Sequence, residues 1–163
     1  MVPGSEEERT LLSAQSIAIP ANAAIASSRW VVVDKTCQVM FAGEGSNGVK
    51  FVFKVSTGEP GWETSNQEVV RAFRYDPALE NDGWHNSTKF PAAEDNPLNG
   101  NMYRPIYFHR GQAIHGANNV PPEPASKGCV RVRPENQDAL IAWLGLGDVD
   151  GPTYNRDLSL IHI

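Results

Sequence analysis

Most apolar residues of this chain lie in short runs that have the β-branched content or the two-residue alternation of strands. The segment 49–56, for example, places Val49, Phe51 and Phe53 on one face of the chain. Strands are expected at 30–33, 37–41, 49–56, 69–75, 102–108, 112–115 and 130–132. This pattern predicts a mainly β fold, a small sandwich or barrel-like set of mixed strands with one principal helix.

That helix is expected to begin at Pro134, because proline suits the first helical turn, where its missing N–H would have no partner. The carboxylates of Glu135 and Asp138 favour the positive end of the helix dipole. Gly145 suits the position at which the helix ends. The apolar stripe that would face the core consists of Ala139, Leu140, Trp143 and Leu144.

The 163 residues are enough for one domain with a hydrophobic core. We interpret 1–28 as an extension or linker with a short helix at 6–16, 29–150 as the domain, and 151–163 as a tail. The segment 76–100 is rich in Asn, Asp, Pro and Gly, which predicts a long surface loop. The last six residues, LSLIHI, also match what a transposon-end adapter of DNA library preparation encodes, so we expect a sequencing artefact there.

The chain is mildly acidic, with 19 Asp and Glu residues against 14 Lys and Arg and a net charge of −5. This balance, without a basic cluster, argues against a protein that binds nucleic acid. No apolar run is long enough for a membrane span, since the longest, 17–26, is interrupted by Pro20 and Asn22. Acidic residues at 6–8 stand where a signal peptide would carry basic ones, so no signal peptide is visible.

The chain has two cysteines, Cys37 and Cys129, which could form a disulfide in an exported protein. Cys37 falls on an expected strand, which predicts a buried and inert thiol. Cys129 stands in the stretch SKGCVRV, 14 residues after the His115 of IHGANN. Acyl transfer to a thiol requires a thiolate, a base that takes and returns a proton, and donors for the developing oxyanion. Cys129 and His115 can supply the first two.

The neighbours of Cys129 suit the same chemistry. A free cysteine titrates near ~8.5, so a positive charge nearby is needed to populate the thiolate at neutral pH. Lys127 and Arg131 flank the cysteine and can contribute that charge. Gly128 permits a tight backbone conformation, in which the amides of 128–130 would face a substrate carbonyl and form an oxyanion hole.

The stretches IHGANN and SKGCVRV resemble the signature of the L,D-transpeptidase (YkuD-type) family, a His-Gly pair followed by Ser/Thr-x-Gly-Cys-Ile/Val-Arg. The segments RWVVVD at 29–34 and VSTG at 55–58 are similar to the family's opening strands and the turn after them. The resemblance covers roughly 29–146. Three features depart from the family pattern: Lys127 replaces a common His, the loop before Cys129 is short, and 63–67 lacks the usual TPxG element.

The resemblance implies a role for each residue at a matching position. Cys129 would be the acyl-accepting nucleophile and His115 the general base. The residues expected to shape the cysteine loop and the oxyanion site are Gly116, Ser126, Gly128, Val130 and Arg131. The residues expected to bind substrate, in a cleft walled by 117–125, are Trp84, Tyr103, Tyr107, Asn118 and Lys127.

The implied reaction is the formation of 3→3 cross-links in peptidoglycan, an activity that bears on cell wall organisation and cell shape. The enzyme would cleave the L,D-bond of a tetrapeptide stem, release the terminal D-alanine, and pass the acyl group to an amine of a second stem. No cofactor or metal is expected. Stem peptides are the expected partners, carbapenems the expected inhibitors, and the periplasm or cell wall the expected location.

Other readings of the same residues remain open. Papain-like cell-wall peptidases place the cysteine before the histidine, and sortases have a much longer interval between the two, so chain order favours the first reading. With water as acceptor, the same site would make an L,D-carboxypeptidase or a lytic enzyme. A wall-binding module without catalysis, or a metal site formed by His109, His115 and Cys129, is the remaining alternative, although structural zinc needs four good ligands. His85 is expected to be solvated in its loop.

Overall fold

The structure is a computed structural model that describes residues 5–6, 29–45, 48–65, 73–77, 82–91, 100–155 and 158–162. The expected helix at 6–16 lies outside the described residues except for its first position. Of the expected strand at 69–75, only the last three residues are described.

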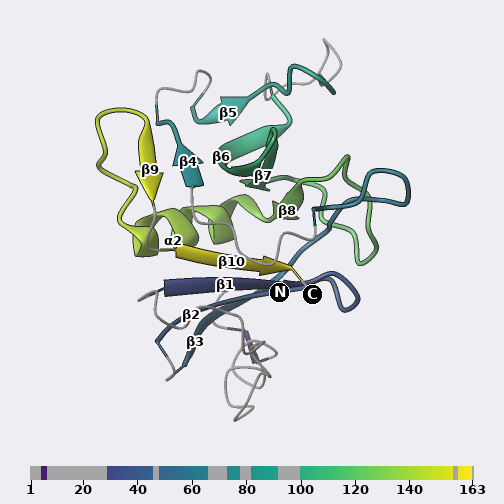
Figure 1. The fold of residues 1–163 in the computed structure, drawn as a ribbon, viewed down its shortest axis with the longest axis horizontal. Coiled ribbons are helices and arrows are strands. Elements are labelled where there is room, and N and C mark those ends of the chain that lie inside the picture. Colours follow the sequence, from purple (N-terminus) through teal and green to yellow (C-terminus); the bar gives the residue numbers. More distant parts are fainter. Residues whose placement is uncertain are drawn as a thin grey trace.

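The first sheet has four strands in the order β10-β1-β2-β3. β1 (Arg29–Asp34), β2 (Val39–Glu44) and β3 (Val49–Lys54) form an antiparallel meander. β10 (Leu158–His162) pairs with β1 in parallel, as Figure 1 shows near the two marked ends of the chain. A strand of this sheet therefore comes from the segment that we set aside as a tail.

The second sheet has the strand order β8-β7-β6-β4-β9, and β5 pairs with β6 beside this row. Its long antiparallel hairpin consists of β6 (Met102–His109) and β7 (Gln112–Gly116). β8 (Val130–Val132) runs parallel to β7. The shorter strands are β4 (Phe73–Tyr75), β5 (Trp84–His85) and β9 (Thr153–Asn155).

The principal helix, α2 (Pro134–Leu144), lies between the two sheets (Figure 1). It begins with Pro134 in its first turn and ends at Gly145, whose φ of 72° is the left-handed conformation that glycine adopts without strain. Leu140, Ile141 and Leu144 are buried in a core that also contains residues of β1, β2, β3, β4, β6, β7 and β8. One core therefore joins both sheets to the helix, and the prediction of a mainly β fold with mixed strands and one principal helix is confirmed.

The prediction for Cys37 is wrong. The Oδ1 atom of Asp34 accepts hydrogen bonds from the backbone N–H groups of Thr36 and Cys37, both at 2.9 Å, and so holds the chain in a turn. Gln38 follows with a φ of 54°, and β2 begins only at Val39. Cys37 is therefore exposed on the turn, and its thiol forms no disulfide with Cys129.

The core position of α2 predicts the effect of one truncation. The Leu140→Ala variant should lose about 2–5 kcal/mol of unfolding free energy, because Leu140 is 0% exposed and its removal leaves a cavity. Urea denaturation of the wild type, of Leu140→Ala and of a control change at the exposed Ala142, Ala142→Ser, measures this difference. A loss below about 1 kcal/mol for Leu140→Ala would contradict the placement of α2 in the core.

Candidate active site

The loop that carries Cys129 is fastened by backbone hydrogen bonds to the segment that follows β3. Ser56 and Arg131 exchange both of their backbone hydrogen bonds, at 3.0 and 2.9 Å. The N–H of Ser126 donates to the carbonyl of Thr57 at 3.0 Å, and the N–H of Glu59 donates to the carbonyl of Ser126 at 3.0 Å. The clamp formed by 56–59 on the cysteine loop therefore fixes Cys129 from both sides.

Gly58 is the one position of this clamp where only glycine fits. A Cβ atom there would lie 2.0 Å from the carbonyl oxygen of Trp62 and 2.7 Å from the amide nitrogen of Thr64. The Gly58 N–H instead donates to Oγ1 of Thr64 at 2.9 Å. The VSTG turn thus packs closely against 62–64, which explains why its glycine is needed.

His115 lies on β7, and the parallel pairing of β7 with β8 sets it opposite Arg131, two residues beyond Cys129. Gly116, next to it, has no room for a side chain: a Cβ atom would lie 2.7 Å from the Tyr103 ring and 3.1 Å from the Cα of Pro134. This close approach explains why glycine follows His115, because the strand passes directly over Tyr103 and the start of α2.

The His115 ring is buried, 3% exposed, and its Nδ1 atom lies 2.8 Å from the carbonyl oxygen of Gly116. Because a carbonyl oxygen only accepts, Nδ1 must carry the proton, and Nε2 keeps the lone pair that a general base requires. Burial lowers the pKa of His115 to about 4, with a smaller lowering by the charge of Arg131, while the bond to Gly116 opposes the shift. The imidazole is therefore neutral at pH 7.

The thiol of Cys129 is also neutral at rest. Burial raises its pKa above the ordinary value, although a backbone hydrogen bond from Ala113 and the charge of Arg131 both act to lower it. The thiol donates a hydrogen bond to the carbonyl oxygen of Gly111, with the sulfur 3.9 Å from that oxygen. The resting site is thus a thiol and an imidazole, and the thiolate forms only when a base takes the proton.

Lys127 does not act on the thiol as expected, because its Nζ forms an ion pair with Glu59 and lies 5.6 Å from the centre of the Trp62 ring. Gly128 does have the tight conformation that we predicted, with a φ of 106°. Its N–H is, however, committed to Oγ of Ser126 at 3.1 Å, and the same hydroxyl donates to the Cys129 carbonyl at 2.6 Å. The Ser126 hydroxyl therefore bridges two backbone groups of the cysteine loop and fixes its shape.

Cys129 and His115 line the same cavity, which has a volume of about 730 Å³. Of the expected substrate residues and loop, Trp84, Tyr107, Asn118, Lys127 and the first three residues of 117–125 line it as well. Tyr103 does not reach it, since its hydroxyl bonds to Asp138 and its ring packs on Trp84 at 5.1 Å between centroids. The expectation for His85 is wrong: it belongs to β5, is half-buried, lines the cavity, and contacts the Tyr107 ring.

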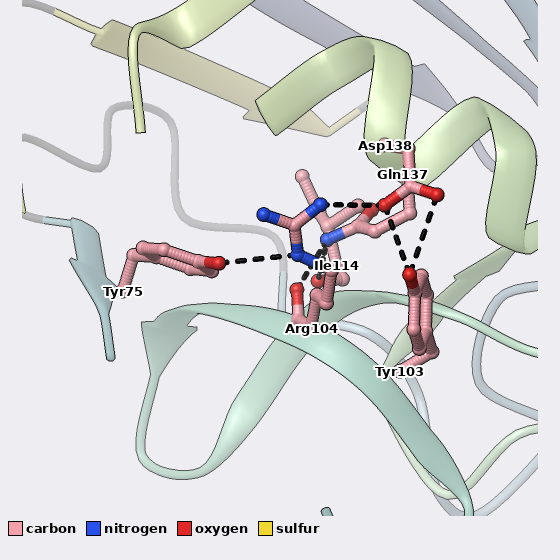
Figure 2. A network of polar contacts seen from close by, with 6 residues as sticks. All are labelled: Tyr75, Tyr103, Arg104, Ile114, Gln137 and Asp138. Carbon is pink, nitrogen blue, oxygen red and sulfur yellow. Dashed lines mark hydrogen bonds and ion pairs between the residues drawn. The ribbon is translucent and has the colours of Figure 1, made fainter. Parts of the chain in front are cut away.

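A network of polar contacts between residues that do not line the cavity holds β6 and β7 against α2 (Figure 2). The Nε2 of the buried Gln137 donates to the carbonyls of Arg104 at 2.7 Å and Ile114 at 3.1 Å. The Arg104 guanidinium in turn bonds to Asp138 at 2.6 Å and to the hydroxyl of Tyr75 at 3.2 Å. Because Ile114 directly precedes His115, α2 fixes the strand that presents the imidazole.

Sequence reasoning missed several residues of the site. Gln112 donates from Nε2 to the Glu63 carbonyl at 3.2 Å, accepts from the Ser65 N–H at 2.9 Å, and packs over Gly128. No local pattern marks it, because its partners lie 47 to 49 residues away in the sequence. The missed cavity residues with charged or aromatic side chains are Trp62, Lys89, Phe90 and Arg110.

Residues 28–154 match the family model of the L,D-transpeptidase catalytic domain, YkuD. This match covers most of the chain and agrees with the His-Gly and Gly-Cys elements of the site. The chain therefore belongs to the L,D-transpeptidase family. A search of the curated proteins finds no match to it.

Solved structures show the same fold. An L,D-transpeptidase from Xylanimonas cellulosilytica (residues 123–326) is 26% identical, with a TM-score of 0.54, and the match covers 84% of this chain and 61% of that one. One from Stackebrandtia nassauensis is 20% identical, with a TM-score of 0.55 and coverage of 83% and 55%. A third, LdtMt1 in complex with imipenem, is 15% identical, with a TM-score of 0.50 and coverage of 83% and 59%. The chain thus spans less than two thirds of each of these structures.

Within the described part of the chain, His, Cys, Asp and Glu side chains form no group of three or more that could hold a metal ion. In the same residues, no helix has the length and apolar character that a membrane crossing requires.

The lowered pKa of His115 predicts a pH dependence of stability. Between its ordinary value of 6.5 and about 4, the unfolded chain binds a proton at this imidazole and the folded chain does not, so stability falls as pH falls. The loss from this one group should reach about 3 kcal/mol near pH 4.

Urea denaturation of the wild type and of His115→Gln at pH 7.5, 6, 5 and 4 tests this prediction. Carboxylates titrate in both proteins, so the difference between their two pH profiles isolates the imidazole. The variant should lose less stability over this range. Identical pH profiles would contradict a buried neutral His115.

Proposed function

We propose that this protein is a peptidoglycan L,D-transpeptidase that forms a thioester acyl-enzyme on Cys129 and makes 3→3 cross-links. The proposal rests on the placement of Cys129 and His115 along one cavity, with Nδ1 of His115 occupied by the Gly116 carbonyl. Family membership supports the reaction type. Its place of action would be the cell wall, where the substrate lies.

In the first half-reaction, Nε2 of His115 takes the thiol proton while the sulfur of Cys129 attacks the carbonyl of the L,D-bond. The tetrahedral intermediate collapses, the C–N bond breaks, and the leaving amine of D-alanine receives the proton from His115. The stem is then held as a thioester. The Gly128 N–H is bonded to Ser126 and Val130 is paired with β7, so in this scheme the amide of Cys129 supplies an oxyanion donor.

In the second half-reaction, an amine of a second stem attacks the thioester. His115 removes the proton of that amine, the C–S bond breaks, and the sulfur leaves as a thiolate that regains a proton from His115. The new amide joins the two stems, and the enzyme returns to its neutral resting pair. A hydrolase would use the same steps with water in place of the amine.

Mass spectrometry with imipenem tests the nucleophile, because the structural neighbour LdtMt1 forms a complex with this compound. The wild type should gain one covalent adduct, and peptide mapping should place it on Cys129. Cys37→Ser is the matched control: it removes the exposed thiol and should leave the adduct unchanged. Cys129→Ala should form none, and an adduct that maps to Cys37 would contradict the assignment.

The acceptor is tested with a purified stem tetrapeptide, incubated with and without an excess of an amine-bearing acceptor stem. We expect release of D-alanine in both cases and a cross-linked product when the acceptor is present. Cys129→Ala should reduce the rate by at least about a thousandfold. Release of D-alanine with only the hydrolysed tripeptide, even at high acceptor concentration, would assign the chain to the L,D-carboxypeptidases instead.

A further inference from the structure

The cavity of this acidic chain is lined by cations. Lys89, Arg110, Lys127 and Arg131 all face it, and no Asp or Glu occurs among its described lining residues. The whole chain has the opposite balance, with a net charge of −5. Charges of one sign gathered in a concave site focus the electric field and attract a ligand of the opposite sign. The charge distribution therefore favours an anionic ligand.

Two of these cations share an aromatic support at the side of the cavity. The Nζ atoms of Lys89 and Lys127 lie 5.2 and 5.6 Å from the centre of the Trp62 ring. The Lys89 ammonium also lies 5.5 Å from the centre of the Phe90 ring, and Phe90 packs edge-on against Trp62 at 4.9 Å. We call these four residues, Trp62, Lys89, Phe90 and Lys127, the basic aromatic wall.

The wall keeps positive charge available for a ligand. Trp62 is 39% exposed, and no other large hydrophobic residue among those described is classed as exposed. Its ring supports two ammonium groups by cation–π contact, which holds them in place without neutralising them. Lys127 is partly neutralised by its ion pair with Glu59, which lies outside the cavity lining, whereas Lys89 has no ion pair with any described residue. Lys89 is therefore the stronger candidate for an anion contact.

We propose that the basic aromatic wall binds a free carboxylate of the acyl-donor stem, so that the enzyme selects stems with carboxylates over stems in which these groups are carboxamides. This inference rests on the proposed function and specifies its substrate. A carboxylate accepts charge-assisted hydrogen bonds from ammonium groups, whereas a carboxamide carries no charge for the cavity field to attract. No residue of the wall takes part in the proton transfers of the proposed mechanism, so its effect should fall on KM rather than on kcat.

The test uses two synthetic stem tetrapeptides that differ only in that the acidic side groups are free carboxylates in one and carboxamides in the other. Release of D-alanine is measured with the full chain as wild type, Lys89→Gln and Lys50→Gln. Lys50 is the matched control, since it is an exposed lysine of β3 outside the cavity. Imipenem acylation, followed by mass, checks that each variant keeps a working thiol.

The wild type should have a lower KM for the free-carboxylate peptide. Lys89→Gln should raise that KM by about fivefold and leave kcat unchanged. The KM for the amidated peptide should stay the same, so the preference for the free-carboxylate peptide should fall by the same factor. Lys50→Gln should behave as the wild type. The wild-type preference should also weaken as salt is raised, because ions screen partly exposed charges.

The outcomes separate this inference from the proposed function. Equal kcat/KM for the two peptides, or a preference that Lys89→Gln leaves intact, would overturn carboxylate selection by the wall and leave the transpeptidase assignment standing. If the wild type cleaves neither peptide, the proposed function fails. Calorimetric titration of Cys129→Ala with both peptides then decides the inference, since tighter binding of the carboxylate form supports it and equal binding overturns it.

Discussion

The geometry of this site depends on the paired backbone hydrogen bonds between Ser56 and Arg131. They join the segment that leaves the first sheet to the edge strand of the second, at the point where the cysteine loop ends. β7, on the other side of β8, carries His115 in register with Arg131. One short strand therefore sets the thiol loop and the imidazole relative to each other, and a shared core with α2 between the sheets keeps that strand in place.

The candidate site combines a neutral thiol and a neutral imidazole with a charged cavity. Burial favours the neutral thiol of Cys129 and the neutral imidazole of His115, while Arg131 is the nearby cation that acts on both. The remaining cations of the cavity are Arg110, on the turn between β6 and β7, and the two lysines of the basic aromatic wall. Burial thus keeps Cys129 and His115 neutral, while cations line the cavity that the two residues share.

Local patterns explain what could be predicted from the sequence. The strands and α2 followed from alternation, Pro134 and Gly145. Two short motifs pointed to His115 and Cys129, which line one cavity, and their catalytic roles stay a prediction. The prediction that Cys37 is buried on a strand was wrong because hydrogen bonds to the Asp34 side chain form a turn there. Strand propensity does not account for such hydrogen bonds. The wall was missed because Trp62 and Lys127 meet only in the folded chain, and the intervening segments have no period that would relate them.

The ring tautomer of His115 is the most direct test of a neutral thiol–imidazole pair. Nitrogen chemical shifts of the histidine rings, recorded on the wild type and assigned with His115→Gln, report which ring nitrogen carries the proton. The structure predicts a neutral ring at pH 7, with the proton on Nδ1 and a bare Nε2. A protonated Nε2 at that pH, either in the opposite tautomer or in an imidazolium beside a thiolate, would contradict this account.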